Sequence, residues 1–303
     1  ALYFSAQPNG MIAAIPILGA MALGAQRMLP ILQLIYSSLS SLRAGYSSLL
    51  DVINMLEEPT NEALIKAHNF SIEFKKYITF QNLQFKYSDD GPWILDGIDL
   101  SIPKGDMLGI IGVTGSGKST LTDILMGLLH PNSGSFFVDD IVITESNKFG
   151  WQSALAHVPQ SIFLTDSSIA ENIALGVPPD EIDFNLVQRS AEQAQIHDTI
   201  SAWPNKYNTI VGERGVRISG GQRQRIGIAR ALYKKASVII FDEATSALDS
   251  STEASVMQSI ASLNKDLTII IVAHRLTTLK NCSNIIELSN GKILRQGVYN
   301  DII

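Results

Sequence analysis

The first 26 residues of the chain contain no charged side chain and are mostly apolar. A strong turn signal at residues 7–10 (QPNG) divides them into two helical pieces. The 15 residues from Met11 to Ala25 are uniformly apolar, and residues 26–31 extend them to the roughly 20 that a membrane-spanning helix needs. A buried core helix is the alternative, but a bilayer tolerates the Gly, Ala and Pro residues better. We therefore interpret this stretch as a membrane helix, and the lack of a preceding basic segment argues against a signal peptide.

Apolar residues then recur at alternating steps of four and three, which is the spacing of a heptad seam. The seam consists of Met28, Leu32, Ile35, Leu39, Leu42, Tyr46, Leu49, Ile53 and Leu56. It predicts one long helix that leaves the membrane and is broken near Pro59, because proline removes a backbone donor. Arg27, Arg43 and Lys66 assign this end to the cytoplasm by the positive-inside tendency. The chain begins without Met and inside an apparent helix, so we expect a piece of a longer polypeptide.

From about Phe70 the apolar pattern changes to short segments typical of strands. Three continuous apolar runs, at residues 107–111, 238–241 and 268–272, predict buried strands of a parallel sheet. The expected fold is mixed α/β, with these strands in a central, mostly parallel sheet and an antiparallel β edge formed by residues 70–102.

Two further features complete the expected fold. A helical insertion runs roughly from Glu145 to Lys235 and includes a helix that opens at Ser219. The Asn290-Gly291 pair predicts the turn of a C-terminal hairpin, because Asn-Gly favours positive φ at both turn positions.

The segment after the first buried strand has the spacing of a phosphate-binding loop, or P-loop. It reads GVTGSGKST from residue 112 to residue 120 and leads into a helical stretch at residues 121–129. The glycines let backbone N–H groups turn towards phosphate oxygens, and the helix N-terminus adds a positive dipole end. In such loops Lys118 would reach the β- and γ-phosphates, and the Ser119 hydroxyl would bind Mg²⁺. The nucleotide-binding residues expected in this segment are Gly112, Thr114, Gly115, Ser116, Gly117, Lys118, Ser119 and Thr120.

The other two buried strands also end in chemically active residues. Asp242 and Glu243 follow the second strand, and His274 follows the third. Because the carboxyl ends of parallel strands meet at one edge of a sheet, we expect Asp242 at the Mg²⁺ ion. Glu243 would accept the proton of an attacking water. A lone histidine after a strand is more often structural, but the position of His274 beside two such strand ends favours a catalytic role.

Composition narrows the class of protein. A chain with 46% hydrophobic and 17% charged residues is not disordered by composition. The net charge is -6, and because residues 1–50 carry +2, residues 51–303 carry -8, which indicates two different environments. The acid excess argues against binding to nucleic acid. The single cysteine, Cys282, excludes an internal disulfide and a multi-cysteine metal site, which fits a reducing compartment.

Residues 70–303 resemble the nucleotide-binding domain of ABC transporters, whose motifs they match in order. Tyr87 matches the aromatic residue that stacks on adenine, and Gln160 matches the glutamine of the loop that senses Mg²⁺ and faces the membrane domain. The sequence ISGGQ at residues 218–222 resembles the family signature, with Ile where Leu is commonest. The sequence SALD at residues 246–249 matches the loop that crosses to a partner domain. The resemblance implies that the ATP of the partner domain is contacted in trans by Ser219, Gly220, Gly221, Gln222 and Asp249.

This resemblance also implies the fold, the domains and the cofactors. The fold would be that of a P-loop NTPase, with a parallel sheet, an antiparallel β subdomain and a helical subdomain, preceded by a long membrane-exiting helix. Residues 1–57 would be the C-terminal end of a transmembrane domain, residues 58–69 a linker, and residues 70–303 the nucleotide-binding domain. ATP and Mg²⁺ would be bound, with the metal held by Ser119, Gln160 and Asp242. The catalytic residues would be Glu243, His274 and Gln160.

The exporter branch of the family is indicated by two features. Residues 209–215 (TIVGERG) resemble a segment peculiar to exporters, and the fused N-terminal helix has the exporter arrangement. Short similarities at residues 27–30, 151–152 and 281–282 point to bacterial flippases of lipid-linked oligosaccharides. The resemblance thus implies a dimeric ATPase that drives substrate export or lipid flipping, with a lipid or lipid-linked oligosaccharide as a candidate substrate. It would reside in the bacterial inner membrane, with its ATPase domain on the cytoplasmic face.

Two other classes share the core motifs. A soluble ABC-type ATPase acting on nucleic acid or ribosomes would lack the membrane helix and the exporter segment. A membrane-bound regulatory module would bind ATP without turnover, and the loss of Glu243 or His274 would indicate it. Both residues are present, so we favour the hydrolysing exporter.

Overall fold

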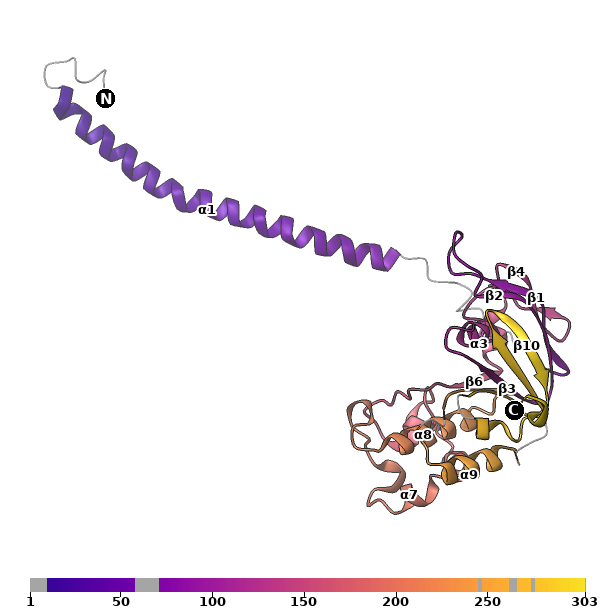
Figure 1. Ribbon diagram of the computed structural model, residues 1–303. Helices are drawn as coiled ribbons and strands as arrows, with labels where there is room; N and C mark the ends of the chain where they lie inside the picture. The colour runs from indigo at the N-terminus through magenta and orange to yellow at the C-terminus, as the bar shows by residue number, and fades with distance from the viewer. Residues whose placement is uncertain (1–9, 58–70, 245–246, 262–265, 274–275, 303) are drawn as a thin grey trace. The chain divides into compact units, whose positions relative to one another are not determined.

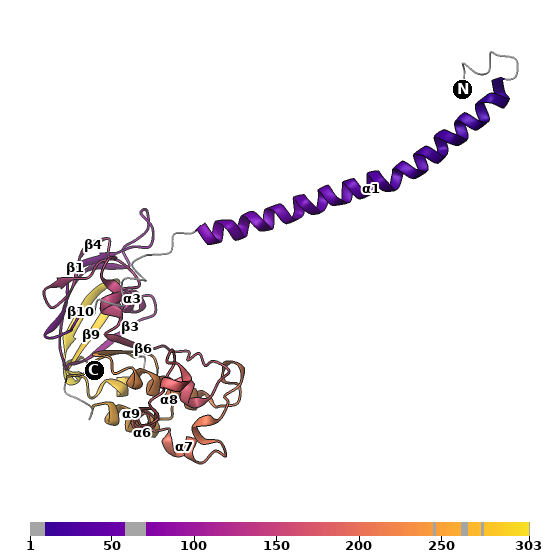
Figure 2. The same ribbon diagram turned by 180° about the vertical axis from the view of Figure 1, so that it is seen from behind.

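The computed structural model describes residues 10–57, 71–244, 247–261, 266–273 and 276–302. Backbone contacts divide the chain into two compact units, residues 1–62 and residues 63–303. The first unit contains one described helix, and the second holds the sheets and the other described helices, as Figures 1 and 2 show from opposite sides.

Helix α1 (Gly10–Glu57) confirms the long helix expected at the N-terminus. With 48 residues at about 1.5 Å each it is roughly 72 Å long, more than twice the ~30 Å hydrocarbon core of a bilayer. Its described side chains are exposed, and apolar residues such as Met21, Leu34 and Leu42 are 67–70% exposed. Among the described residues it is the one helix long and apolar enough to cross a membrane. An apolar surface of this extent needs lipid or protein against it.

A sheet of six strands, in the order β10-β9-β3-β8-β7-β6, forms the centre of the second unit within the described residues. Neighbouring strands from β9 to β6 are parallel, and β10 pairs antiparallel with β9. The strands are β3 (Met107–Gly112), β6 (Leu155–Val158), β7 (Val238–Asp242), β8 (Thr268–Val272), β9 (Asn284–Ser289) and β10 (Lys292–Gly297). The predicted parallel sheet is therefore confirmed. The hairpin turn is also confirmed, because Asn290 and Gly291 have positive φ, at 49° and 76°.

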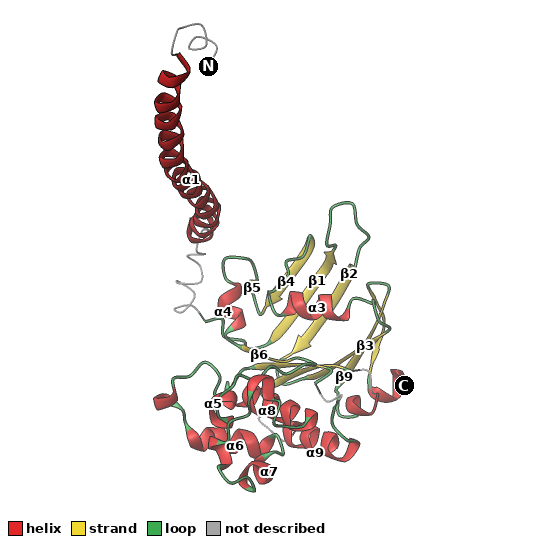
Figure 3. Cartoon of the chain, turned by 90° about the vertical axis from the view of Figure 1, so that its left-hand side faces the viewer, coloured by secondary structure: helices red, strands yellow, loops and turns green. Residues whose placement is uncertain are grey.

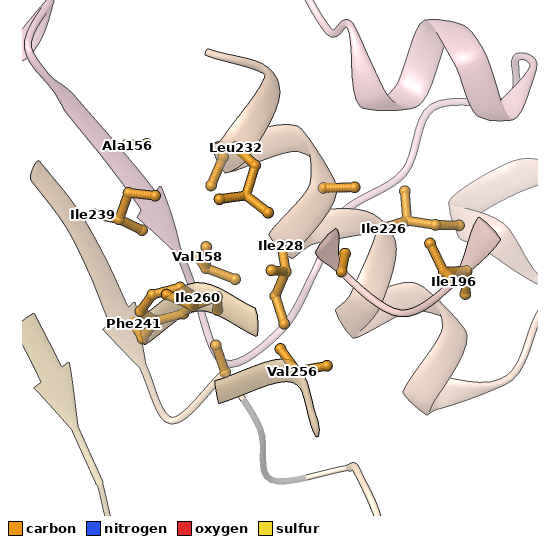
Figure 4. Close-up of a cluster of buried hydrophobic side chains, with 14 of the residues drawn as sticks. Ala156, Val158, Ile196, Ile226, Ile228, Leu232, Ile239, Phe241, Val256 and Ile260 are labelled. Atoms are coloured by element: carbon orange, nitrogen blue, oxygen red, sulfur yellow. The ribbon is translucent and has the colours of Figure 1, made fainter. Parts of the chain in front are cut away.

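Both faces of this sheet are buried, because successive side chains of a strand point to opposite sides. Ile239 and Phe241 belong to a cluster with residues of helices α8 (Gly220–Tyr233) and α9 (Ser250–Ala261). Ile240 and Ile270 belong to a second cluster that contains the apolar residues of the other sheet. Figure 4 shows the first cluster, in which Val158, Ile239 and Phe241 meet Ile228, Leu232, Val256 and Ile260.

A separate antiparallel sheet, in the order β2-β1-β4-β5, packs on the other face of the central sheet (Figure 3). Its strands are β1 (Tyr77–Phe85), β2 (Leu95–Pro103), β4 (Ser133–Val138) and β5 (Ile141–Val142). The predicted β edge at residues 70–102 was therefore incomplete, because it contains only half of these strands. In the structure Ile78 lies opposite Ile102 on one side and opposite Val138 on the other.

Helix α3 (Lys118–Leu125) begins inside the P-loop, earlier than the predicted stretch at residues 121–129. It also ends earlier, because Gly127 adopts a φ of +66° and donates its N–H to the carbonyl of Ile124 at 2.9 Å. The end of α3 is fixed by Trp151 of α4 (Lys148–Gln152), whose indole N–H donates to the carbonyl of Leu125 at 2.7 Å. Trp151 is fully buried.

The predicted helical insertion contains helices and also a strand of the central sheet. Strand β6 lies within its predicted span, at the edge of that sheet, so the insertion proper begins after Val158. Its helices, which gather on one side in Figure 3, are α5 (Ile169–Ile173), α6 (Phe184–Gln193), α7 (His197–Ser201) and α8, with 3-10 turns at Pro179–Glu181, Lys206–Asn208 and Glu213–Gly215. After the insertion come α9, a 3-10 turn (Leu276–Leu279) and α10 (Tyr299–Ile302).

Replacing Trp151 with Phe should lower the free energy of unfolding by about 1–3 kcal/mol, because the carbonyl of Leu125 loses its donor. Trp93→Phe is the matched control, since Trp93 is 42% exposed, and it should change that free energy by less than about 0.5 kcal/mol. Urea unfolding followed by circular dichroism measures both. If the Trp151 variant were as stable as the unsubstituted chain, the indole would not hold α3.

Candidate functional site

Neighbouring strands of the central sheet bring the predicted site residues to one edge. Strands β3, β8, β7 and β6 are adjacent and parallel, so their carboxyl ends lie side by side. The P-loop follows β3, Asp242 ends β7 with Glu243 directly after it, and Gln160 follows β6. His274, the residue predicted after β8, lies outside the described residues.

The P-loop is packed tightly from behind. Gly112 has a φ of +149°, and a Cβ added there would lie 2.3 Å from the carbonyl oxygen of Leu288 in β9. Gly117 has a φ of +103°, and its Cβ would lie 2.9 Å from the carbonyl oxygen of Ile94. Both positions therefore require glycine for its positive φ and for the close approach of another backbone. Thr114 and Gly115 on the loop are exposed, so this side is open to a ligand.

The interior of the loop holds groups suited to an anion. The Lys118 side chain is buried, and its ammonium donates to the carbonyls of Gly112 and Val113 at 2.7 and 3.1 Å. The Ser116 hydroxyl is buried and has no hydrogen-bond partner in the described part of the chain. A buried hydroxyl without a partner is uncommon and calls for a ligand. Together with the first N–H groups of α3, these groups fit the phosphates of a nucleotide.

Tyr87 lies two residues beyond β1, with 65% of its surface exposed. Its hydroxyl is 3.2 Å from the hydroxyl of Thr120, on the first turn of α3. The ring of Phe85 meets it edge to face, with the centroids 5.0 Å apart. The contacts with Thr120 and Phe85 thus hold the Tyr87 side chain in place while most of its surface stays exposed. An exposed aromatic ring of this kind is suited to stacking against a base. Ser119, on the same turn of α3, is exposed.

Glu243 and Gln160 are brought into contact. The Gln160 side-chain amide donates to the Glu243 carboxylate at 2.9 Å. Glu243 has a φ of +51°, which is uncommon for a residue other than glycine, and its N–H donates to the carbonyl of Val272 in β8 at 2.9 Å. Strained backbone of this kind gathers at functional sites. Asp242, the last residue of β7, is half-buried beside them.

Two titratable neighbours of Asp242, Asp123 and His157, were not predicted from the sequence. Burial raises the pKa of Asp123, and the charge of Asp242 raises it further. Burial lowers the pKa of His157, while the charges of Asp242 and Asp123 oppose that change. Asp123 lies four residues after Ser119 on α3, so the helical period could have placed it on the face of the predicted metal ligand.

The predicted signature residues form the N-terminus of α8. Ser219 is its N-cap: the hydroxyl accepts the N–H of Gln222 at 3.3 Å, and the Ser219 N–H donates to the Gln222 side chain at 2.9 Å. This capping box engages the Ser219 hydroxyl and the Gln222 side chain, two of the groups that the family resemblance assigns to the ATP of a partner domain. The N–H groups of Gly220 and Gly221 lie in the first turn, where a helix offers no acceptor of its own.

Asp249 lies at the start of α9 and is exposed. Its carboxylate accepts the Ser251 hydroxyl at 2.5 Å and the backbone N–H of Thr252 at 3.0 Å. Hydrogen bonds from Ser251 and Thr252 lower the pKa of Asp249, so the group is charged at neutral pH. Ser246, at the start of the same predicted loop, lies outside the described residues.

Comparison with known proteins agrees with these motifs. Residues 95–246 match the ABC transporter family. The chain is 34% identical over 264 residues to an ATP-dependent lipid A-core flippase of Chromohalobacter salexigens, covering 87% of this chain and 45% of that protein. It is 39% identical over 285 residues to the alpha-hemolysin translocation ATP-binding protein HlyB of Escherichia coli, covering 93% of this chain and 39% of HlyB.

A solved structure is also similar. It is described as a bacterial Atm1-family ABC exporter with ATP bound, with a TM-score of 0.71 and 35% identity, and the match covers 77% of this chain and 41% of that one. The chain spans less than half the length of these relatives. Since the family match extends over half of its residues, this chain belongs to the ABC transporter family, whose ATP-binding domains are ATPases.

Proposed function

We propose that this chain binds and hydrolyses ATP at the edge formed by β3, β7 and β6, as the ATP-driven part of a membrane exporter. The observation that carries this proposal is the P-loop. One short segment there holds the buried Lys118 ammonium, the Ser116 hydroxyl, which has no partner among the described residues, and a helix N-terminus. Asp242, Glu243 and Gln160 lie at strand ends of the same edge.

The parts of ATP are assigned to separate groups. The phosphates occupy the loop of residues 112–120, and the Lys118 ammonium exchanges its carbonyl partners for the β- and γ-phosphates. The adenine stacks on the exposed ring of Tyr87. The Ser119 hydroxyl, the Asp242 carboxylate and the Gln160 side-chain oxygen are ligands of the kind that Mg²⁺ prefers. When bound, Mg²⁺ supplies positive charge that offsets the phosphate oxygens.

Hydrolysis is an in-line attack of water on the γ-phosphorus. The Glu243 carboxylate accepts one proton of that water as its oxygen bonds to phosphorus, and the bond to the bridging oxygen breaks so that ADP leaves. Gln160 holds the carboxylate in place through its 2.9 Å hydrogen bond. Lys118 offsets the charge that develops on the phosphate oxygens. His274 is assigned to the γ-phosphate and the water on sequence grounds alone.

The working unit contains two ATP-binding domains. The N–H groups of Gly220 and Gly221, the Ser219 hydroxyl and the Gln222 side chain contact the γ-phosphate held by the partner domain, and Asp249 crosses to the same interface. Support comes from the position of these residues at the exposed N-terminus of α8 and at the start of α9. The partner is a second copy of this chain or a related one.

The N-terminal unit is assigned to the membrane. Residues 1–57 are the end of a transmembrane domain, residues 58–69 a linker and residues 70–303 the ATP-binding domain. The exposed apolar surface of α1 supports this, and Arg27 and Arg43 favour the cytoplasmic face of a bacterial inner membrane for the ATPase. The transported substrate is a lipid or a lipid-linked oligosaccharide, a proposal supported by similarity to a lipid A-core flippase. The acidic net charge of -6 argues against a nucleic-acid partner.

Glu243→Gln should bind ATP normally and lose about 10² to 10⁴ in turnover, as expected when a general base is removed. The amide can still accept the Gln160 hydrogen bond, so local structure is retained. Phosphate release and ATP titration measure the two effects. Glu181→Gln, at an exposed residue of the insertion, is the control and should hydrolyse ATP normally. Normal phosphate release from the Glu243 variant would show that another group accepts the proton of the attacking water.

Tyr87→Ala should weaken ATP binding by about 1–3 kcal/mol, the usual contribution of base–aromatic stacking. Tyr87→Phe should retain most of the affinity, because it keeps the ring and loses only the contact with Thr120. Calorimetric titration with ATP and with inorganic triphosphate separates base from phosphate contacts, and triphosphate affinity should not change. If Tyr87→Ala bound ATP with full affinity, Tyr87 would not contact the adenine.

A further inference from the structure

The segment that carries Gln160 has no regular structure of its own. Strand β6 ends at Val158, and the next helix, α5, begins at Ile169. The segment Ser161–Leu164, which directly follows Gln160, is therefore positioned by its contacts with other elements, and those contacts lie mainly on α8.

Ile162 packs against the backbone of α8 at Gly227. A Cβ added at Gly227 would lie 2.5 Å from the terminal carbon of Ile162 and 2.9 and 3.1 Å from its two γ-carbons. Gly227 is buried in the middle of α8, where glycine costs about 1 kcal/mol of helix stability relative to alanine. The close approach of Ile162 is a physical reason for glycine at this position.

Arg230 binds the same segment one turn further along α8. Its guanidinium donates to the carbonyl of Phe163 at 3.0 Å, and its Nε donates to the carbonyl of Asn172 at 2.8 Å. Asn172 is fully buried, and its side-chain amide accepts the N–H of Thr165 at 3.0 Å and donates to the Thr165 carbonyl at 3.1 Å. Arg230 thus joins α8 to Phe163 within the segment and to Asn172 of α5, whose side chain holds Thr165 directly after the segment.

No carboxylate of the described residues pairs with Arg230. Burial lowers its pKa, and its hydrogen bonds go to oxygen atoms of Phe163 and Asn172. Burying a guanidinium that pairs with neutral oxygens costs desolvation energy, and this cost offsets much of the stability that its hydrogen bonds give to the loop. Its geometry suits the precise placement of a backbone.

The next residue of the segment reaches the signature end of α8. Leu164 is buried against Gly215, where an added Cβ would lie 3.0 Å from it and 3.2 Å from the side chain of Arg223. Arg223 in turn donates to the carbonyl of Ile218 at 2.8 Å, directly before the N-cap Ser219. The segment that follows Gln160 is therefore packed near the residues that precede the N-terminus of α8.

We propose that Arg230 is a positioning residue for the ATPase reaction: with Gly227 it fixes the segment Ser161–Leu164 on α8 and so holds the Gln160 amide at the Glu243 carboxylate. This rests on the roles that the proposed function gives to Gln160 and Glu243. The loss of Arg230 frees the segment, the 2.9 Å contact between Gln160 and Glu243 loosens, and the carboxylate is no longer held towards the water. A displacement of about 1 Å at a reacting group can cost 10²-fold in rate.

Arg230→Met removes the guanidinium but keeps a long apolar stem. It should lower kcat for ATP hydrolysis by about ten- to a hundredfold. KM for ATP and the ATP-induced rise in melting temperature should stay within about twofold of the unsubstituted values, because the P-loop and Tyr87 are unchanged. The control is Lys234→Met, directly after α8. Lys234 donates to the carbonyl of Leu155 at 2.5 Å, ahead of Gln160, and does not hold the segment, so kcat should be retained.

A double-mutant cycle separates positioning from general destabilisation. If Arg230 acts through Gln160, Arg230→Met should lower kcat by less than twofold in a Gln160→Ala background. Losses that multiply, or an unchanged kcat in Arg230→Met, would overturn this inference and leave the proposed function intact. If Gln160→Ala hydrolysed ATP at the normal rate, the role assigned to Gln160 would be wrong. The inference about Arg230 would then be wrong as well, because it depends on that role.

A second route avoids the arginine altogether. Gly227→Ala should displace Ile162 and lower kcat in the same way, with KM unchanged. Adding Ile162→Ala removes the atoms that an alanine at 227 would meet, so the double variant should recover most of the lost kcat. A double variant as slow as Gly227→Ala would show that displacement of this segment does not cause the loss.

Discussion

The shape of the P-loop depends on glycine positions where two backbone segments lie too close together to leave room for a side chain. A Cβ at Gly112 would lie 2.3 Å from the carbonyl oxygen of Leu288, and one at Gly291 would lie 2.5 Å from that of Ile94. The N–H of Gly291 donates to the Ser116 carbonyl at 3.3 Å, so the turn of the C-terminal hairpin supports the P-loop from behind. The loop is thus shaped by segments distant in sequence, while Thr114 and Gly115 on its open side are exposed.

The remaining groups of the site are arranged around that fixed loop by the parallel sheet. Strand β8 holds the backbone of Glu243 through the carbonyl of Val272, and the segment after β6 brings Gln160 to the Glu243 carboxylate. These contacts differ in rigidity. The P-loop is held by close backbone packing, whereas the segment after Gln160 is held by side-chain contacts with α8. Under the proposed function, a change within the helical insertion would alter the Glu243 carboxylate without disturbing the P-loop.

The residues that the sequence predicts best are those whose signal is local. The apolar runs of β3, β7 and β8 and the P-loop spacing each combine composition with a short motif, and the structure has them within about a residue of the expected positions. The pairing of β4 with β1 was missed, because nothing near residues 133–138 specifies a partner some 50 residues earlier. The contact between Arg230 and Phe163 was missed for the same reason, since it depends on tertiary packing.

The most direct test of nucleotide binding at this loop is calorimetric titration of the chain with MgATP. Lys118→Ala should weaken binding about a hundredfold, near 3 kcal/mol, because it removes the ammonium that the loop surrounds. Lys75→Ala, an exposed lysine at 63% side-chain exposure, is the control and should bind as the unsubstituted chain does. Equal MgATP affinity in the folded Lys118 variant would contradict the assignment of the P-loop as the phosphate site.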